Sequence, residues 1–277
     1  MKTNKSHFIA NTLTYGILTI AAIALVFPFL WMVSGAFKNA LEVVKMPPQL
    51  LPSKFSFENF IEIKKYFPIE RFFLNSVLVS TITTMLQLLF CSMAAFVFAK
   101  FKFRGREALF MLYLITLMIP RQVTLVPLFI VFSKLRLTDT FLGLILPDVF
   151  SAFGTFLLRQ HMLTIPDSFL EAAYMDGASH LKVFTRIMLP LSKPALATLG
   201  IFAFMYSWNN YLWPLIIINS KELMTLPLGL SKLTGRWATE WNILMAGNVI
   251  SFIPILIVYI FAQKYFIKGL TLGGNKG

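Results

Sequence analysis

Long apolar runs separated by short polar segments dominate this chain of 277 residues. A bilayer core about 30 Å thick is crossed by about 20 helical residues that rise 1.5 Å each. Four runs are long enough and contain no Lys, Arg, Asp or Glu: residues 8–37, 72–99, 195–220 and 242–263. The pattern predicts four membrane-spanning helices, at about Leu13–Ser34, Phe72–Ala99, Ala195–Ser220 and Asn242–Gln263.

Two further apolar runs each contain a single charge. Residues 108–133 include Arg121, and residues 140–158 include Asp148. We predict spans near Leu109–Leu128 and Phe141–Leu158, which makes six. An ionisable side chain in a membrane is costly unless it finds a partner. Because both charges fall toward the outer ends of adjacent predicted spans, we expect a structural ion pair rather than a gate. Snorkelling of the arginine to the interface is the alternative.

Composition agrees with an all-α integral membrane protein. The chain is 57% hydrophobic and 13% charged, whereas soluble domains carry about 25% charged residues. Two lysines precede the first run, as in a signal peptide, but the run exceeds the 7–15 apolar residues of a signal. We therefore expect an uncleaved first helix. One cysteine and three scattered histidines exclude an intrachain disulfide and predict no metal site.

Basic residues give the expected orientation. The net charge is +13, but the basic residues lie between apolar runs, so we expect membrane-side loops and no nucleic-acid partner. Six spans place both termini on one side, and totals of 13 and 12 basic residues do not separate the two sides. Residues 100–106 concentrate four basic residues, whereas residues 38–71 spread six over 34 positions. We therefore predict that both termini are cytoplasmic.

A polar segment follows the fourth predicted span. Ser168 and Glu171 have the spacing of a capping box, which predicts a helix start at Ser168. Gly177 suits the position after a helix end, where a positive φ is needed. Ser179 is able to cap a second helix, which we expect to stop before Pro190. The segment thus predicts two short helices that meet at a glycine elbow.

The same segment resembles a known signature. Glu-Ala-Ala, three residues, Gly, nine residues, Ile, one residue and Leu-Pro is the cytoplasmic motif of type-I ABC importer permeases. The matching residues are Glu171, Ala172, Ala173, Gly177, Ile187, Leu189 and Pro190. The resemblance implies the type-I ABC importer permease fold. It divides the chain into residues 1–70 (terminus, first helix and external loop), 71–263 (transmembrane domain with a coupling loop at about 161–193) and 264–277 (cytoplasmic tail).

Three other segments are similar to carbohydrate permeases of the maltose-system type: residues 208–214, 225–230 and 269–277. This resemblance implies a permease subunit of an ATP-driven, binding-protein-dependent sugar importer in the cell membrane. Its partners would be a second homologous permease, two ATPase subunits and an extracytoplasmic solute-binding protein, within membrane lipid. The chain would bind no cofactor and would not be an enzyme. ATP-Mg would be used by the partner ATPase, since the chain contains no phosphate-binding loop of the Gly-x₄-Gly-Lys-Ser/Thr type.

The resemblance assigns roles to residues outside the spans. The Glu-Ala-Ala motif residues would couple to the ATPase. The tail is expected to enter the interface between the ATPases, through Gly273, Gly274, Lys276 and Gly277. A frayed terminus is the alternative. Contact with the binding protein is expected from Lys232, Gly235, Arg236 and Trp237.

One face of the fifth predicted span combines amides with aromatic rings. Tyr206, Asn210 and Trp213 are spaced i, i+4 and i+7, and Asn209 adjoins them. Sugars are bound by hydrogen-bonding groups beside aromatic planes, so this face is a candidate translocation path. Contacts between helices are an equal alternative.

Two other classes remain as alternatives. An ion-coupled secondary transporter of a small polar solute predicts inverted repeats and broken helices, and no internal repeat is found. A membrane enzyme would need clustered His, Ser or carboxylate side chains, and the sequence shows no such cluster.

Overall fold

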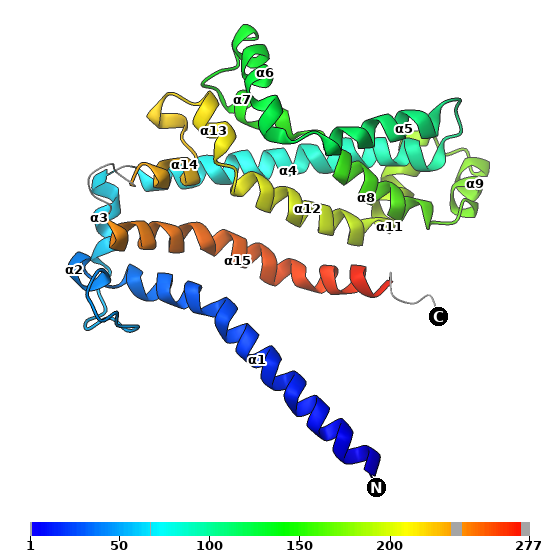
Figure 1. The fold of residues 1–277 in the computed structure, drawn as a ribbon. Coiled ribbons are helices and arrows are strands. Elements are labelled where there is room, and N and C mark those ends of the chain that lie inside the picture. Colours follow the sequence, from blue (N-terminus) through cyan, green and yellow to red (C-terminus); the bar gives the residue numbers. More distant parts are fainter. Residues whose placement is uncertain (1, 67, 234–239, 273–277) are drawn as a thin grey trace. The chain divides into compact units, whose positions relative to one another are not determined.

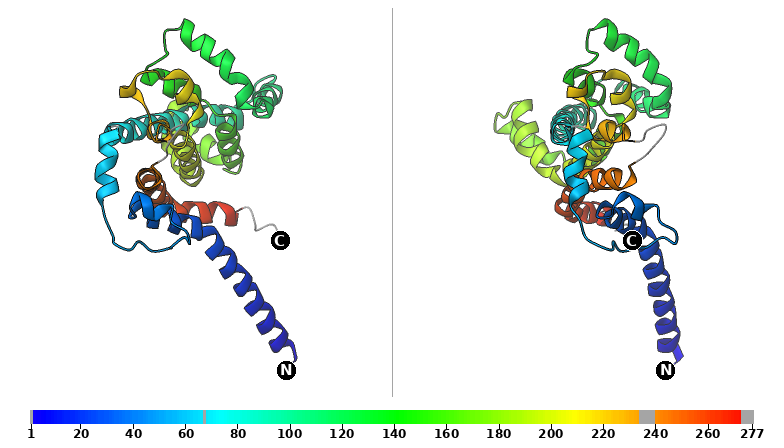
Figure 2. Two further views of the ribbon diagram at one scale, coloured as in Figure 1. Left: turned by 60° about the vertical axis from the view of Figure 1, so that its left-hand side comes forward. Right: turned by 90° about the vertical axis from the view of Figure 1, so that its left-hand side faces the viewer.

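The computed structural model of the chain describes residues 2–66, 68–233 and 240–272, and all regular structure in these residues is helical (Figures 1 and 2). The chain forms two compact units, residues 1–69 with 230–253, and residues 70–229 with 254–277. The principal helices are α1 (Lys2–Ala36), α2 (Ala40–Val43), α3 (Glu58–Tyr66), α4 (Ile69–Lys100), α5 (Arg106–Ile115), α6 (Arg121–Lys134), α7 (Phe141–Ile145), α8 (Ala152–Leu163), α9 (Ser168–Met175), α10 (His180–Val183), α11 (Leu189–Leu191), α12 (Lys193–Trp208), α13 (Leu212–Ile217), α14 (Leu226–Ser231) and α15 (Trp241–Leu272).

Three helical segments are long and apolar enough to cross a membrane unbroken. They are residues 11–36 of α1, all of α4, and residues 241–261 of α15. Three further pairs of helices pass the same criteria only as bent pairs, so the described residues provide up to six crossings. The prediction of an all-α membrane fold is confirmed, and the number of crossings is consistent with six.

The third predicted span, Leu109–Leu128, is not one straight helix. Its two halves, residues 106–118 and α6, meet at an angle of 100°. The break lies at Ile119, whose backbone is extended with ψ of 116°, followed by Pro120. A proline disfavours the helical conformation of the residue before it, so the chain leaves the helix there.

The fourth and fifth predicted spans are also interrupted. Residues 141–148 and α8 are bent by 45°, and α8 begins where the Ser151 hydroxyl accepts from the Gly154 amide. The range Ala195–Ser220 is wrong as a single helix. There α12 ends at Trp208, and residues 209–211 separate it from α13. Composition did not reveal this break because the whole run is uncharged.

In the first unit, one buried amide joins the ends of three helices. The Asn59 side chain on α3 donates to the carbonyls of Ala36 and Lys38 at 2.8 and 2.7 Å. Its oxygen accepts from the Asn242 amide at 2.7 Å. The last carbonyls of a helix have no partner within the helix, so Asn59 satisfies the end of α1 and fixes the start of α15.

In the second unit, α4 is the central element, and α8 and α12 lie beside it in both figures. One hydrophobic cluster surrounds its C-terminal half, from Cys91 to Ala99, with side chains of α8, α9, α10 and α12. Another surrounds Val79 with Phe132, Trp213 and residues of α7. The cavities described below lie within this unit.

Candidate functional site

Two neighbouring cavities lie among the broken helices of the second unit. One, of about 710 Å³, is lined by α6 and by the α12–α13 break, from Phe202 to Trp213. The other, of about 760 Å³, is lined by residues of α4, α6, α8 and α12. Arg121, Phe202 and Tyr206 line both cavities. The broken helices therefore enclose two adjoining spaces with shared polar walls.

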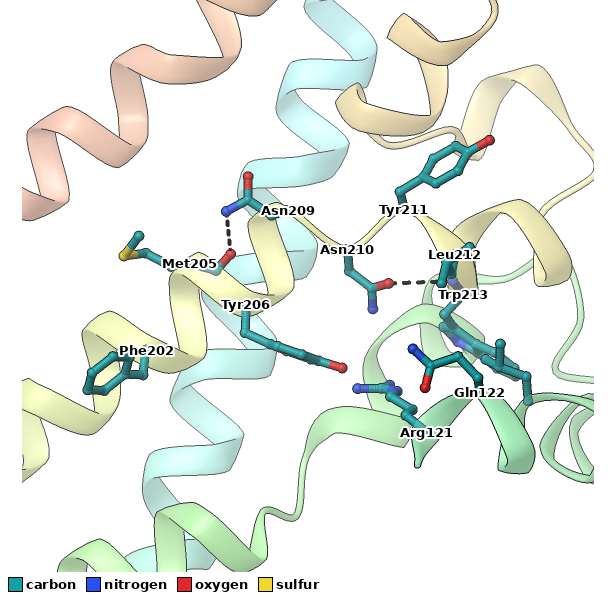
Figure 3. Close-up of a pocket in the computed structure, with 11 residues that line it drawn as sticks. Arg121, Gln122, Phe202, Met205, Tyr206, Asn209, Asn210, Tyr211, Leu212 and Trp213 are labelled. Carbon is teal, nitrogen blue, oxygen red and sulfur yellow. Dashed lines mark hydrogen bonds between the residues drawn. The ribbon is translucent and has the colours of Figure 1, made fainter. Parts of the chain in front are cut away.

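The ion pair predicted between the two intramembrane charges is present. An Arg121 guanidinium nitrogen lies 2.7 Å from an Asp148 carboxylate oxygen. The arginine is 36% exposed, while the aspartate is 9% exposed. The guanidinium carbon also lies 5.1 Å from the centre of the Tyr206 ring, and Figure 3 shows these two side chains pointing toward each other. Snorkelling alone does not describe Arg121, because its charge is engaged by Asp148.

The expected helical face of Tyr206, Asn210 and Trp213 does not exist as a continuous surface, since the helix ends between them. All three still line the smaller cavity, as does Asn209. Tyr206 is the member that reaches both cavities. Asn209 turns back and donates to the Met205 carbonyl at 2.8 Å.

The other two members of that set hold the break in place. The Asn210 side chain accepts from the Trp213 backbone N–H and donates to Asp148, both at 3.4 Å. Trp213 is buried, and its indole N–H donates to the Gly143 carbonyl at 2.8 Å. These contacts fix α13 against α7, so Trp213 is chiefly a packing residue.

Sequence reasoning missed a polar face on α4. Ser76, Ser80, Thr83 and Gln87 follow the spacing i, i+4, i+7 and i+11, and all are at least nine-tenths buried. The Ser76 hydroxyl oxygen accepts from the Leu226 backbone N–H at 2.7 Å, whereas the Ser80 and Thr83 hydroxyls have no partner among the described residues. The helical spacing of polar residues within an apolar run was the available signal.

The predicted elbow is formed by α9 and α10. Gly177 has a φ of +75°, a conformation that L side chains rarely adopt. The Ser179 side chain accepts from the Lys182 amide, as a cap should. Glu171 and Ala172 are exposed, Ala173 is half-buried, and the exposed apolar side chains Phe169 and Met175 lie on the same helix.

The predicted helix start at Ser168 is confirmed, but the capping box predicted there does not form. Asp167 occupies the cap position without a side-chain bond to the helix, because its carboxylate accepts from Lys100 at 2.6 Å. The hydrogen bond and the charge of Lys100 hold the pKa of the Asp167 carboxyl below its ordinary value. Lys100 also donates to the Ile165 carbonyl at 2.6 Å. The end of α4 therefore supplies the anchor of α9.

The second short helix also ends later than predicted. A π-helical turn, Phe184–Met188, and α11 carry the chain past Pro190 to Leu191. Pro190 falls in the first turn of α11, where its missing N–H is tolerated. Ile187 and Leu189 are half-buried there, and Pro190 is exposed.

Lys232 is exposed at the end of α14. The other candidate contacts for a binding protein, Gly235, Arg236 and Trp237, lie outside the described residues, as do the tail residues 273–277. Among the described residues, no group of three or more His, Cys, Asp or Glu is placed to hold a metal ion.

Comparison with known proteins gives consistent matches over most of the chain. Residues 87–272 match the family described as the binding-protein-dependent transport system inner membrane component. The arabinooligosaccharides transport system permease protein AraQ of Halalkalibacterium halodurans is 40% identical over 283 residues, covering 100% of both chains. The sn-glycerol-3-phosphate transport system permease protein UgpE of Brucella abortus is 33% identical and covers 95% of this chain and 96% of its own.

A solved structure matches equally broadly. It is a crystal structure of a bacterial ABC transporter involved in the import of the acidic polysaccharide alginate. The TM-score is 0.84 at 26% identity, over 94% of this chain and 98% of that chain. The similarity therefore includes the arrangement of helices as well as the sequence.

Proposed function

Because the chain belongs to the family of binding-protein-dependent transport system inner membrane components, we propose that it is one of two permease subunits that together import a sugar or oligosaccharide. It is an ABC transporter permease of the cytoplasmic membrane and not an enzyme. The observation that carries the sugar assignment is the 40% identity to AraQ over the entire chain. The cavity walls support it, since they combine amides with the Tyr206 ring.

ATP hydrolysis is proposed to reach this chain through the hairpin of α9 and α10. Its exposed surface combines Glu171 and Ala172 with the apolar Phe169 and Met175, and exposed apolar side chains rimmed by polar ones are typical of protein interfaces. Two ATPase subunits bind here and to the homologous hairpin of the second permease, and they use ATP-Mg. Both termini lie on the same cytoplasmic side. A short helix anchored at both ends transmits a rigid-body rotation.

The opposite side of the membrane is proposed to receive a solute-binding protein. The segment from Lys232 to Trp237 is its contact, because in the sequence it lies between the last two predicted spans, one span away from the coupling segment. Deleting residues 232–237 is expected to abolish stimulation of the ATPase by the binding protein and to leave unstimulated hydrolysis. Equal stimulation of the deletion variant would exclude this contact.

The tail is proposed to enter the interface between the ATPases. Removal of residues 273–277 leaves every described helix intact. Assembly should therefore survive, whereas ATP-driven transport should fall well below that of the full chain at equal membrane abundance. Full transport by the truncated chain would mean that the tail is only a frayed end.

The energy source distinguishes this proposal from an ion-coupled secondary transporter. The structure contains broken helices, which such a transporter would also have, so architecture alone does not separate the two. The complex should be reconstituted with its second permease and ATPase, and uptake of labelled arabinotriose measured with the binding protein present. We expect uptake to require ATP on the side of the membrane where the ATPase subunits are bound. Uptake should persist after ionophores collapse the ion gradients. Uptake that follows the ion gradient without ATP would overturn the proposal.

A further inference from the structure

One polar side chain on the wall of the larger cavity has no hydrogen-bond partner among the described residues. Gln87 is its lining residue from α4 and is 8% exposed. Among the described residues, no hydrogen bond to its amide is recorded. An amide on the wall of a cavity is open to water, and it is able to exchange that water for the polar groups of a ligand. An amide that faces a cavity and has free donors and acceptors is suited to a ligand.

We propose that Gln87 binds the transported solute directly and that this solute is an uncharged, polyhydroxylated molecule. The inference deepens the proposed function and rests on it. Its first support is the position of the cavity, which adjoins the break between α12 and α13 and shares Tyr206 with the smaller cavity. An amide on one wall and an aromatic ring on another provide hydrogen bonds and an apolar plane for the same ligand.

The charge of the cavity selects against an anion. Its ionisable lining residues are Arg121 and Asp148, which neutralise each other at 2.7 Å. An anionic solute would have to draw Arg121 away and leave the buried Asp148 carboxylate without its partner, which is strongly unfavourable. Hydroxyl groups require no such exchange. The names of two relatives mention a neutral solute, arabinooligosaccharides, and an anionic one, sn-glycerol-3-phosphate. The Arg121–Asp148 ion pair favours a neutral solute for this chain.

The same face of α4 carries further unpaired hydroxyl groups. Ser80, Thr83 and Thr84 lie one and two turns before Gln87, and their hydroxyls have no partner among the described residues. Residues three and four apart on a helix are neighbours. The hydroxyls therefore lie along the Gln87 face, toward the end of α4 where Ser76 contacts the Leu226 amide. These hydroxyls line neither cavity, so they would meet a hydroxylated solute only when α4 and its neighbours shift during transport.

Two near-isosteric variants separate binding from packing. Gln87→Met removes the amide with little change of length, and Thr83→Val removes only a hydroxyl. Because the Thr83 hydroxyl is unpaired, Thr83→Val should melt at or above the wild-type temperature. The control is Ser92→Ala, whose hydroxyl is already paired with the Leu89 carbonyl at 2.9 Å and which lines neither cavity.

Each variant is assembled with the second permease and ATPase, and ATP-driven uptake is measured with the binding protein present, as a function of solute concentration. The probes are labelled arabinotriose, maltotriose, trigalacturonate and glycerol 3-phosphate. For the wild type we expect import of one or both neutral trisaccharides and neither anion. Gln87→Met should import that trisaccharide roughly tenfold less efficiently, and Thr83→Val severalfold less, with assembly retained. Ser92→Ala should match the wild type.

The outcomes distinguish the inference from the function it rests on. Wild-type uptake by Gln87→Met, or a loss in Thr83→Val that is accompanied by a lower melting temperature, would overturn the role of α4. ATP-driven import of the anions alone would overturn the neutral solute and leave the importer function intact. Import that does not require ATP would reject the proposed ABC importer itself.

Discussion

The Lys100 ammonium, at the last residue of α4, lies 2.6 Å from a carboxylate oxygen of Asp167, the residue that precedes α9. The lysine side chain is 4% exposed and also donates to the Ile165 carbonyl at 2.6 Å. The aspartate side chain is 68% exposed, so the pair contributes little to global stability. Its consequence is positional, because it fixes the start of the proposed coupling helix to a transmembrane helix.

Lys100→Met should loosen this anchor while keeping the length of the side chain. The variant leaves the Ile165 carbonyl and the Asp167 carboxylate without their shared donor. We expect normal insertion and assembly, but solute imported per ATP hydrolysed should fall roughly threefold to tenfold, the range of a lost charged hydrogen bond at a partly exposed site. The neighbouring Lys102→Met is the control, because Lys102 is exposed and acts on Asp167 only through its charge, without a hydrogen bond or ion pair to these groups. An unchanged ratio in Lys100→Met would show that the anchor does not act in coupling.

The pH dependence of this pair follows from the direction of its pKa shift. Lys100 lowers the pKa of Asp167 from an ordinary value of 3.8. A carboxyl with a lowered pKa contributes stability above its unfolded pKa and loses it as the pH falls through its folded pKa. The stability difference between wild type and Lys100→Met should therefore be constant between about pH 5 and 8 and shrink only below about pH 4. Thermal unfolding of both proteins across this range tests it, and a difference that varies near neutrality would contradict it.

Gly177 allows the elbow to be tested without changing its helices. Its φ of +75° strains most side chains, although a Cβ there would meet nothing within 4 Å in the described residues. Asp and Asn tolerate this conformation better than other residues. We expect Gly177→Asp to insert and fold but to uncouple transport, with uptake reduced roughly tenfold if about 1.4 kcal/mol is lost at the interface.

Gly177→Asn is the matched control for that variant. It has nearly the same shape as Asp without the charge. Loss of uptake in both variants would indicate a restriction of space at the ATPase, whereas loss in Asp alone would indicate charge. Reconstituted vesicles with equal permease content provide the measurement. Wild-type transport by Gly177→Asp would remove the assignment of the hairpin as a coupling element.

The sequence predicted the elements that depend on local chemistry. Positive φ at Gly177 and the cap at Ser179 follow from single residues and their neighbours. The Arg121–Asp148 pair followed from the cost of isolated charges in a membrane. The start of α9 at Ser168 was also predicted, but its anchoring was not. Asp167 is held by Lys100, which is 67 positions away in the chain, and no local sequence pattern reveals such a contact.

The broken helices were less accessible to sequence reasoning. Pro120 carried a usable signal for the third span, because the residue before a proline avoids the helix. The break at residues 209–211 depends instead on tertiary contacts, among them the bond from the Trp213 indole to Gly143. Hydropathy is averaged over a window of residues, so a short break inside an apolar run does not change it. The Gln87 face was readable from spacing, but its cavity required the positions of α6, α8 and α12.

The Arg121–Asp148 pair makes a final prediction, in which the two single variants are unequal. Arg121→Gln leaves a carboxylate that is 9% exposed without its cation, whereas Asp148→Asn leaves an arginine that is 36% exposed and able to reach water. Removing one partner of a buried pair costs about 3–5 kcal/mol, and the partial exposure of Arg121 reduces this to about 1–3 kcal/mol. We expect Arg121→Gln to lower the melting temperature more than Asp148→Asn.

The double variant decides whether the pair is structural or gates transport. With both charges neutralised, no uncompensated charge remains, so the double variant should be more stable than Arg121→Gln alone. Glu62→Gln, which breaks an exposed pair with Lys65, is the control and should change little. Strictly additive losses in the cycle would show that the two side chains do not interact energetically. If stability and transport recover together, the pair is structural. If stability recovers while transport stays low, the charges act in conduction, and the pair is a gate.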